Sequence, residues 1–572
     1  MNIYNKNISP KSVDFLQKII KSNNNLPEIN QKIENVCGIA VFFENTKDAD
    51  FFKDKSLNLS DRSEKSEYGD YQTNTNLSVQ VCELLKSKKI NPNIIFEPTF
   101  GKGNFIISSL KTFDNIEQIF GVEIYKPYIQ ITKFKILDYF IQNLNQKAPK
   151  IKLFHANIFD FDTKKHININ KNDNFLILGN PPWVTNTELS GINSKNLPRK
   201  VNFKNHKGLD AMTGKGNFDI AEFITNSLFE KFADKTGNFA FLIKNSVIKN
   251  ILQRQIVNNY KITNLEKFII DAKKEFNVSV NASLFYCKLN SKSDKLCAEF
   301  DFYTKEKIKE FGWVNDKFVS NTDTYQKYAN FDGICQYEWR QGMKHDLTKV
   351  MEIEKVADNL YQNKFNEKFE LEEELVYGIL KSSDLKGETI NKTRKYTIIT
   401  QKKIGQATSF IKNDYHKTYN YLQSKFDLFS KRKSSIYKGK PAFSIFGIGD
   451  YSFKPYKIAI SGLYKQLNFT LIKPDKNNKP IMLDDTCYFI GFDDEKEAEI
   501  IFEVLKSEEV KEFLSSLIFN DAKRSVTKDL LMRIDISAVM KNKNIRKNKN
   551  DNYLKISRRI TPITQTKLAL FG

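Results

Sequence analysis

The chain has 572 residues, 40% of them hydrophobic, which is enough for about 3–4 domain-sized units with substantial cores. Lysine and arginine number 90 against 68 aspartate and glutamate, so the formal net charge is +22 and the isoelectric point is near 9.3. This excess of cations favours an anionic partner, most simply nucleic acid, although a composition rich in Lys, Asn and Ile is also typical of AT-rich genomes.

The cysteines and the apolar runs exclude several classes of protein. No Cys-x-x-Cys pair is present, which argues against a zinc site or a disulfide framework and favours a reducing compartment. The N-terminus has no apolar signal core, and no apolar run is long enough to cross a bilayer. We therefore expect a soluble bacterial protein of the cytoplasm, associated with the nucleoid when bound to DNA, with no membrane partner and no metal. The cysteines are Cys37, Cys82, Cys287, Cys297, Cys335 and Cys487.

The first predicted elements are helical. Residues 1–65 are polar apart from short apolar patches, and they predict a small helical lead-in that lacks a nuclease signature and is too short for a nuclease domain. The apolar spacing from Leu77 to Leu85 predicts a helix, and Thr73 or Asn74 ahead of it suits an N-cap.

Two glycines lie between a predicted strand and a predicted helix. The strand is Ile94–Phe96, the segment 97–105 reads EPTFGKGNF, and the helix runs from about Phe105 to Leu110. Gly101 and Gly103 allow positive φ angles and a close approach of the backbone to a ligand. The succession of strand, glycine turn and helix is typical of the first unit of a nucleotide-binding fold.

Polar side chains follow the next two predicted strands. Glu123 ends the strand Ile116–Val122, about 20 residues after the glycine turn, where a carboxylate can accept both hydroxyls of a ribose. The third strand, Ile151–Phe154, leads to Asn157 and Asp160, each of which carries an oxygen that can accept a hydrogen bond from an adenine amino group.

The fourth predicted strand ends abruptly at Asn-Pro-Pro-Trp. The apolar run Phe175–Leu178 is typical of a buried parallel strand, and the prolines stiffen the chain just beyond its carboxyl end, where open α/β sheets bind ligands. The Asn180 side-chain oxygen and the Pro181 carbonyl can both accept hydrogen bonds from an exocyclic amino group. Trp183 can stack on the attached planar base.

These motifs resemble those of one enzyme family. NPPW resembles motif IV of the amino-methyltransferases that act on adenine N6, and 97–105 resembles the S-adenosylmethionine motif I. The segment 68–77 resembles motif X, with Thr73-Asn74 in place of the usual Thr-Pro. Together with resemblances to motifs V, VI and VIII after NPPW, the order over roughly residues 66–290 is similar to that of gamma-subclass N6-adenine DNA methyltransferases of restriction–modification systems.

The resemblance implies a cofactor, a substrate and a set of site residues. The cofactor would be S-adenosylmethionine, and the reaction would be methyl transfer to N6 of an adenine flipped out of double-stranded DNA, with no covalent intermediate. The catalytic residues would be Asn180, Pro181, Pro182 and Trp183. The flipped base would contact Trp183 and Phe276. The cofactor would contact Tyr71, Thr73, Glu97, Pro98, Gly101, Gly103, Glu123, Asn157, Ile158 and Asn180, with Asp160 the alternative to Asn157.

The rest of the chain predicts DNA contacts. The long loop 184–215 is interpreted as a DNA-facing flap, and the segment 276–286 as the antiparallel hairpin that ends the sheet. A helix is expected from Asn217 to Phe232 and a strand over Phe239–Ile243. His345 beside Asp346 is interpreted as structural or phosphate-contacting rather than as an acid–base pair. The basic run Lys541–Lys549 is interpreted as a solvated tail or a nucleic-acid contact.

The expected fold is α/β: a Rossmann-like S-adenosylmethionine-dependent methyltransferase domain over 66–325, followed by a mixed α/β DNA target-recognition domain over 326–572. A separate cognate restriction endonuclease is a further expected partner. Three alternatives stay open. They are a non-catalytic or regulatory DNA-binding protein on the same fold, a methyltransferase for RNA adenine, cytosine N4 or protein glutamine, and a fused restriction–modification enzyme, which would need a nuclease constellation that the sequence does not show.

Overall fold

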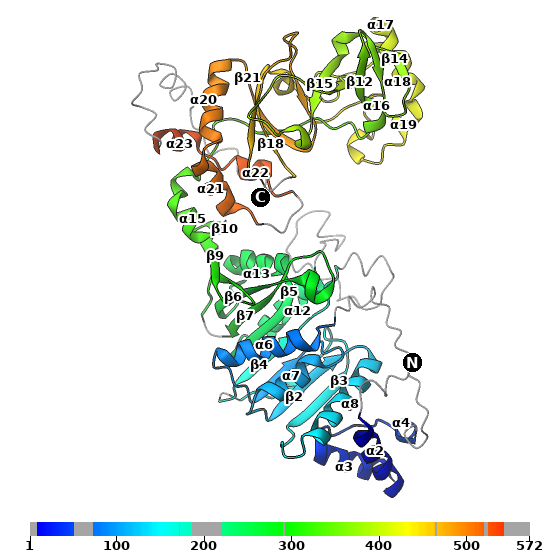
Figure 1. Cartoon of the computed structure of the whole chain (residues 1–572), viewed down its shortest axis with the longest axis vertical. Helices are drawn as coiled ribbons and strands as arrows, with labels where there is room; N and C mark the ends of the chain where they lie inside the picture. Colours follow the sequence, from blue (N-terminus) through cyan, green and yellow to red (C-terminus); the bar gives the residue numbers. More distant parts are fainter. Residues whose placement is uncertain are drawn as a thin grey trace. The chain divides into compact units, whose positions relative to one another are not determined.

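The computed structural model describes residues 9–23, 25–50, 72–170, 172–185, 219–289, 292–463, 466–519 and 524–542. The chain divides into two compact units, Met1–Phe318 and Val319–Gly572, shown in Figure 1. This division falls a few residues before the expected boundary at 326, and each unit is described by itself.

The first unit is built on one mixed sheet. Its strand order is β10-β9-β8-β6-β7-β5-β4-β1-β2-β3 among the described residues. The strands are β1 (Ile94–Glu97), β2 (Gln118–Glu123), β3 (Lys150–His155), β4 (Phe175–Gly179), β5 (Gly237–Lys244), β6 (Ile262–Ile270), β7 (Ala282–Leu289), β8 (Leu296–Asp301), β9 (Lys307–Val314) and β10 (Lys317–Val319).

The strands β3, β2, β1, β4 and β5 are parallel, and β7 runs antiparallel to both β5 and β6. The central strands β1 and β4 are buried along their whole length, which explains why both appear in the sequence as continuous apolar runs. The chain leaves β1 for β2 on one side and later returns to β4 on the other. The carboxyl ends of β1 and β4 therefore lie at a topological switch point, where α/β sheets bind ligands.

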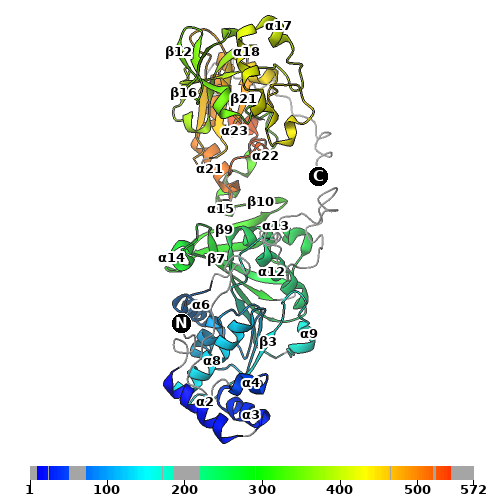
Figure 2. The same ribbon diagram turned by 90° about the vertical axis from the view of Figure 1, so that its right-hand side faces the viewer.

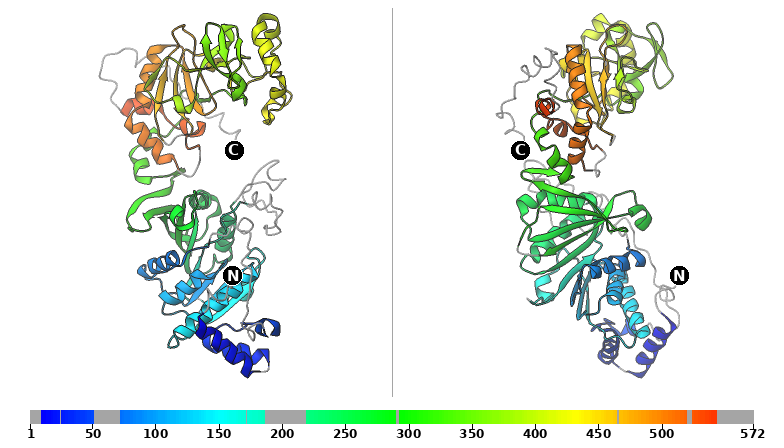
Figure 3. Two further views of the ribbon diagram at one scale, coloured as in Figure 1. Left: turned by 45° about the vertical axis from the view of Figure 1, so that its right-hand side comes forward. Right: turned by 60° about the vertical axis from the view of Figure 1, so that its left-hand side comes forward.

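Helices cover the sheet (Figures 1 and 3). Helix α6 packs on α7, and α7 on α8. Asn74 caps α6, because its Oδ1 accepts a hydrogen bond of 2.8 Å from Leu77 N, so the asparagine that replaces the expected proline satisfies the helix end. The helices are α6 (Thr75–Ser87), α7 (Asn104–Thr112), α8 (Lys126–Gln142), α9 (Thr163–His166), α12 (Ile220–Lys231), α13 (Asn245–Asn258) and α14 (Ala272–Phe276).

The N-terminal helices α2 (Pro10–Ser22), α3 (Leu26–Cys37) and α4 (Thr46–Asp50) belong to this first unit (Figure 2). The Ser12 hydroxyl donates to Asp138 of α8 over 2.7 Å. The Lys133 ammonium, also on α8, donates to the carbonyls of Val41 and Phe42 over 2.8 and 3.0 Å. The N-terminal segment is thus bound to helix α8 of the nucleotide-type fold.

The second unit is mixed α/β, with sheets of order β11-β21-β18-β19-β16 and β14-β13-β12-β17-β15-β20 among the described residues. The strands are β11 (Arg340–Gln341), β12 (Glu352–Ala357), β13 (Leu360–Gln362), β14 (Lys368–Glu370), β15 (Val376–Leu380), β16 (Thr389–Ile390), β17 (Lys395–Ile398), β18 (Tyr456–Ser461), β19 (Phe469–Ile472), β20 (Met482–Leu483) and β21 (Cys487–Phe492). The helices are α15 (Thr322–Lys327), α16 (Thr348–Met351), α17 (Phe410–Asp414), α18 (His416–Ser424), α19 (Phe426–Ser430), α20 (Glu495–Leu505), α21 (Glu508–Leu517), α22 (Lys528–Leu531) and α23 (Ile536–Asn542).

Several smaller expectations have structural outcomes. His345 is 5% exposed, accepts a hydrogen bond from Leu347 N and lies 3.6 Å from buried Glu352, so its role in the fold is structural. All six cysteines are buried free thiols. In the described part of the chain, no helix has the length and apolarity needed to span a bilayer, and no group of three His, Cys, Asp or Glu side chains is placed to hold a metal.

Candidate active site

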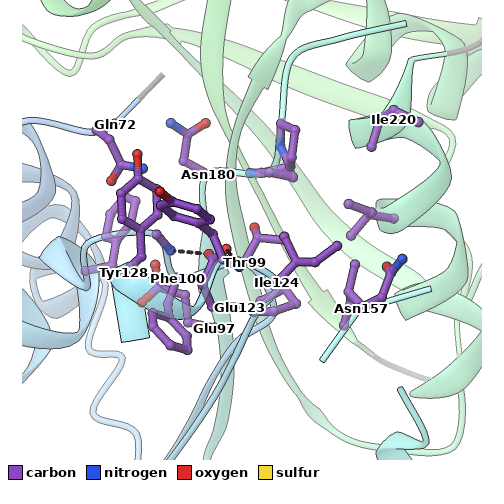
Figure 4. A pocket seen from close by; sticks show the side chains of 18 of the residues that line it. Gln72, Glu97, Thr99, Phe100, Glu123, Ile124, Tyr128, Asn157, Asn180 and Ile220 are labelled. Atoms are coloured by element: carbon purple, nitrogen blue, oxygen red, sulfur yellow. Dashed lines mark hydrogen bonds between the residues drawn. The ribbon is translucent and has the colours of Figure 1, made fainter. Parts of the chain in front are cut away.

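A cavity opens at the carboxyl ends of β1, β2 and β4 (Figure 4). The sheet topology explains its position, since this is the switch point described above. The residues predicted from the sequence that line it are Thr73, Glu97, Pro98, Gly101, Glu123, Asn157, Ile158, Asn180, Pro181 and Pro182. Three predicted residues, Gly103, Trp183 and Phe276, are not among its lining residues. Tyr71 and most of the expected flap, 186–215, lie outside the described residues.

The glycine turn carries the chain from β1 into α7. Gly101 and Gly103 have φ angles of 52° and 69°, in the left-handed region that favours glycine. A Cβ on Gly103 would meet Thr132 of α8 at 2.4 Å, so this glycine permits close helix packing rather than forming the cavity wall. Gly101 does line the cavity, where a Cβ would meet the Gln72 side chain at 2.7 Å.

The carboxylate of Glu123 is held at the tip of β2 by two backbone donors. Its Oε2 accepts from Gly101 N and its Oε1 from Tyr125 N, each over 2.8 Å. Each carboxylate oxygen has lone pairs in excess of these single bonds. A buried carboxylate fixed in this way, and facing the cavity, is suited to accept further hydrogen bonds from a pair of hydroxyl groups.

Glu97 places a second carboxyl group in the same cavity wall. It is 3% exposed, and its Oε2 has no hydrogen-bond partner among the described residues. Burial, together with the neighbouring charge of Glu123, raises the pKa of this carboxyl well above its ordinary value. A buried oxygen without a partner beside a cavity fits a ligand that brings a positive charge or a donor.

The two polar side chains predicted after β3, Asn157 and Asp160, lie in different environments. Asn157 lines the cavity, and its Oδ1 accepts a hydrogen bond of 3.0 Å from Phe159 N, which fixes the amide in the turn. Ile158, 9% exposed, lies beside it in the wall. Asp160 is exposed and is not a lining residue. Asn157 is therefore the polar side chain that β3 supplies to the cavity.

The NPPW turn meets the segment before α6. Asn180 Nδ2 donates to Thr73 Oγ1 over 3.2 Å, across 107 residues of sequence. Thr73 is 5% exposed and Pro181 is buried, so both the threonine partner and the proline after Asn180 are packed in the interior. Because Nδ2 donates to Thr73, the amide oxygen is the acceptor that Asn180 can present to a substrate.

Trp183 and Phe276 touch each other at the end of the same turn. Their ring centroids are 4.8 Å apart in an edge-to-face arrangement. Trp183 is 3% exposed, and its Nε1 donates to the carbonyl of Leu242 on β5 over 3.1 Å. The structure thus brings together the two aromatic residues predicted to hold a base, with the indole packed in the core of the first unit.

Two polar residues of the site were not predicted from the sequence. Gln72 lines the cavity and accepts from Lys102 N over 3.0 Å. Asn104 donates to the carbonyl of Thr73 over 2.6 Å and so ties the start of α7 to the Asn180 partner. Both lie inside the segments 68–77 and 97–105 that resemble motifs X and I, but only the folded chain shows that each contacts a distant segment.

Comparison with known proteins gives one close match. The type II methyltransferase M.NspV of Nostoc sp. (strain ATCC 29411 / PCC 7524) is 38% identical over 479 residues, which are 83% of this chain and 98% of that protein. No protein-family model matches the chain.

Solved structures match more distantly. The type IIG restriction endonuclease BpuSI is 10% identical, over 94% of this chain and 72% of that chain, with a TM-score of 0.37. The methyltransferase subunit of a type I restriction–modification system from Streptococcus thermophilus is 12% identical, over 46% of this chain and 54% of that chain, with a TM-score of 0.27.

The match to M.NspV spans nearly the whole of that protein. The fold is a Rossmann-like S-adenosylmethionine-dependent methyltransferase domain followed by a mixed α/β domain, and the cofactor is S-adenosylmethionine. The chain belongs to the family of type II methyltransferases.

Proposed function

We propose that the chain methylates the N6 amino group of adenine at a specific sequence in double-stranded DNA, as the modification component of a type II restriction–modification system. The observation that carries this proposal is the Asn180–Thr73 hydrogen bond at the mouth of the cofactor cavity. It orients the Asn180 amide, whose oxygen is an acceptor suited to an amino group, and Pro181 follows it in the cavity wall.

The lining residues fit S-adenosylmethionine, which supplies an electrophilic methyl group when bound. Glu123, held by two backbone donors, would accept from the two ribose hydroxyls. Asn157 and Ile158, both in the cavity wall, would contact the adenine ring of the cofactor. The partnerless Glu97 oxygen suits the cationic methionine end.

Asn180 and Pro181 would act on the target amino group. The lone pair of an exocyclic adenine nitrogen is conjugated into the ring, which makes the nitrogen a poor nucleophile. Hydrogen bonds from its two N–H groups to the Asn180 oxygen and the Pro181 carbonyl would localise that lone pair on nitrogen. Alignment of the nitrogen with the methyl group supplies the remainder, and no covalent enzyme intermediate is required.

A target base inside a duplex cannot reach this cavity and would have to be flipped out, at a cost of about a few kcal/mol. Trp183 is proposed to stack on the flipped base, which returns roughly 1–3 kcal/mol. Because Phe276 packs against Trp183, we expect the Phe276 ring to shift when the base enters.

The product separates this proposal from its alternatives. Purified protein would be incubated with S-adenosylmethionine and duplex DNA, RNA or total protein, and the digested products analysed by mass spectrometry. N6-methyladenine from DNA alone supports the proposal. N4-methylcytosine, methylated RNA or methylglutamine would assign the same site to another amino group, and no product with any substrate would favour a non-catalytic DNA-binding protein.

A further inference from the structure

Two loops of the second unit are joined into one structure. The segments 400–408 and 431–446, here called the basic loops, are connected by side-chain hydrogen bonds to the backbone. The Thr400 hydroxyl donates to the carbonyl of Phe443 over 2.7 Å, and the Gln401 Oε1 accepts from Ile445 N over 3.0 Å. The two loops therefore present their tips from a common base.

The base of the loops is also tied to the segment after β11. Lys344 and Phe446 exchange two backbone hydrogen bonds of 2.8 Å. The Arg432 guanidinium lies 3.7 Å from the centre of the Tyr437 ring and donates to the carbonyl of Ser444 over 2.6 Å. Arg432 is thus used to hold the loops together.

Six exposed lysines lie on the basic loops. None of them has a carboxylate within 4.0 Å in the described part of the chain. No Asp or Glu occurs in 399–413 or 428–449. Next to the loops, Asp346 lies 3.5 Å from the Lys344 ammonium. The six are Lys402, Lys403, Lys431, Lys433, Lys438 and Lys440.

Several half-buried lysines of the unit are instead paired with carboxylates. Lys473 contacts the carboxylates of Glu495 and Glu499 at 2.7 and 2.8 Å, and Lys511 contacts Glu508 at 2.7 Å. Those pairs neutralise the surface locally. The basic loops instead leave a concentrated positive charge, which favours a polyanion over solvent ions.

The loop tips are open and partly apolar. Gly405 and Gly439 have φ angles of 80° and 69°, and a Cβ at either position would have nothing within 4 Å. Ile404 is 45% exposed and Phe446 is 39% exposed. An exposed aliphatic group and an exposed ring among unpaired cations match the two needs of a DNA reader, phosphate contact and apolar contact with base edges.

From this geometry we infer that the basic loops are the DNA-reading surface of the second unit, with their lysines on phosphates and Phe446 against bases. The inference rests on the proposed DNA substrate. It names the surface and the residues that recognise DNA, which the catalytic site leaves open. A duplex is favoured over a protein partner because the charge is of one sign and repeated along two adjoining loops.

The test compares two sets of four substitutions in the full chain. One variant carries Lys402→Gln, Lys403→Gln, Lys438→Gln and Lys440→Gln. The matched control carries Lys454→Gln, Lys473→Gln, Lys506→Gln and Lys511→Gln, which removes the same charge from lysines that contact carboxylates. Fluorescence anisotropy with an unrelated DNA duplex gives the Kd over a salt series, and circular dichroism with denaturant unfolding verifies that the second unit of each variant is folded.

We expect the loop variant to raise the Kd about tenfold or more and to reduce the log–log salt slope by about 3–4, since four lysines are replaced and each lost phosphate contact removes about 0.9 from that slope. The control should change the Kd less than about twofold. The inference would be overturned if the two variants changed the Kd for DNA equally, or if the loop variant lost affinity for RNA but not for DNA.

Phe446→Ala provides a second measurement. We expect it to reduce the preference for the methylated sequence motif over an unrelated duplex, with the salt slope unchanged, because the ring carries no charge. Unchanged preference would remove Phe446 from the reading surface. The outcomes distinguish the two proposals. Normal DNA binding by the loop variant would refute the proposed reading surface and leave the proposed methylation intact. If the wild-type protein binds DNA through the loops but does not methylate it, the proposed methylation is refuted and the reading surface stands.

Discussion

Thr73 and Asn180 lie 107 residues apart in the sequence and are joined by a hydrogen bond of 3.2 Å from the Asn180 amide to the threonine hydroxyl. The side-chain amide of Asn104 donates to the backbone carbonyl of the same threonine over 2.6 Å. The start of α7 and the end of β4 thus meet at Thr73, just before α6, and Thr73 orients the Asn180 amide, whose oxygen is proposed to accept from the target amino group.

Thr73→Val tests this positioning role. Valine keeps the shape of the side chain but removes the acceptor for Asn180, so the amide loses its fixed orientation. We expect kcat to fall about tenfold, which corresponds to the loss of one hydrogen bond of about 1–1.5 kcal/mol. The KM for DNA should stay within about twofold, because Thr73 lies in the cofactor cavity. Thr73→Ser, which keeps the hydroxyl, should restore kcat. A valine variant with full kcat would show that the hydrogen bond does not position the amide.

Glu123→Gln tests the assignment of the cofactor cavity. The loss of a charged acceptor for the ribose hydroxyls should weaken S-adenosylhomocysteine binding about tenfold to a hundredfold, measured by titration calorimetry. Glu117→Gln is the matched control, because Glu117 is exposed and directly precedes β2, whereas Glu123 ends it. Equal affinities of the Glu123 variant and the control would place the cofactor elsewhere.

Glu97 makes the stability of the ligand-free protein depend on pH. Its pKa is raised by burial first and by Glu123 second, so above the ordinary value of about 4.5 the folded state keeps a proton that the unfolded state has lost. The free energy of unfolding therefore falls as the pH rises through the interval between the ordinary and the raised pKa. In that interval, Glu97→Gln should gain stability relative to the wild type as the pH rises, measured by denaturant unfolding.

The same carboxyl should release a proton when a cationic cofactor binds beside it. Calorimetry in two buffers of different ionisation enthalpy would count this proton for the wild type, and the count should be lower for Glu97→Gln. Identical proton counts in the two proteins would mean that Glu97 does not face the cationic end of the cofactor.

Lys457 gives the second unit a pH dependence of the opposite sign. The side chain on β18 is fully buried, its ammonium donates to the carbonyl of Lys454 over 2.6 Å, and burial lowers its pKa to about 7. Between that pKa and the ordinary value near 10.5 the unfolded state binds more protons, so stability rises with pH. Lys457→Met should therefore stabilise the protein most near neutral pH and below, on the order of a few kcal/mol, and progressively less toward pH ~10. A pH-independent effect would show that Lys457 does not titrate.

Much of the catalytic unit could be predicted from the sequence because buried parallel strands are continuous apolar runs. The predicted strands Ile94–Phe96 and Phe175–Leu178 correspond to the buried strands β1 and β4, and the predicted helix to Phe232 corresponds to α12. Glycine turns and polar residues at strand ends are local sequence signals, so the predicted residues of the cavity wall could be identified from them. Pairing between distant segments leaves no such signal, and neither the placement of β8 beside β6 nor the sheets of the second unit could be predicted.

Phe276 shows where local pattern was misleading. Its segment, with Val278 and Val280, was expected to be a hairpin strand, but Phe276 ends helix α14 and the strand β7 begins only at Ala282. Asp271 caps that helix by accepting from Lys274 N over 3.0 Å, and Asn277 ends it with a φ of 54°. The burial of Trp183 was missed for a related reason, since its partner Leu242 lies on a strand 59 residues away.

The central claim is best tested by single-molecule sequencing of DNA from cells that express the chain, beside cells that express Asn180→Ala at the same level. The account predicts N6-methyladenine at one sequence motif with the wild type. With the variant it predicts a loss of about 10²-fold or more in methylation rate, because the acceptor for the target amino group is gone. Undiminished methylation by Asn180→Ala, or no new methyladenine from a folded wild-type protein that binds cofactor, would contradict it.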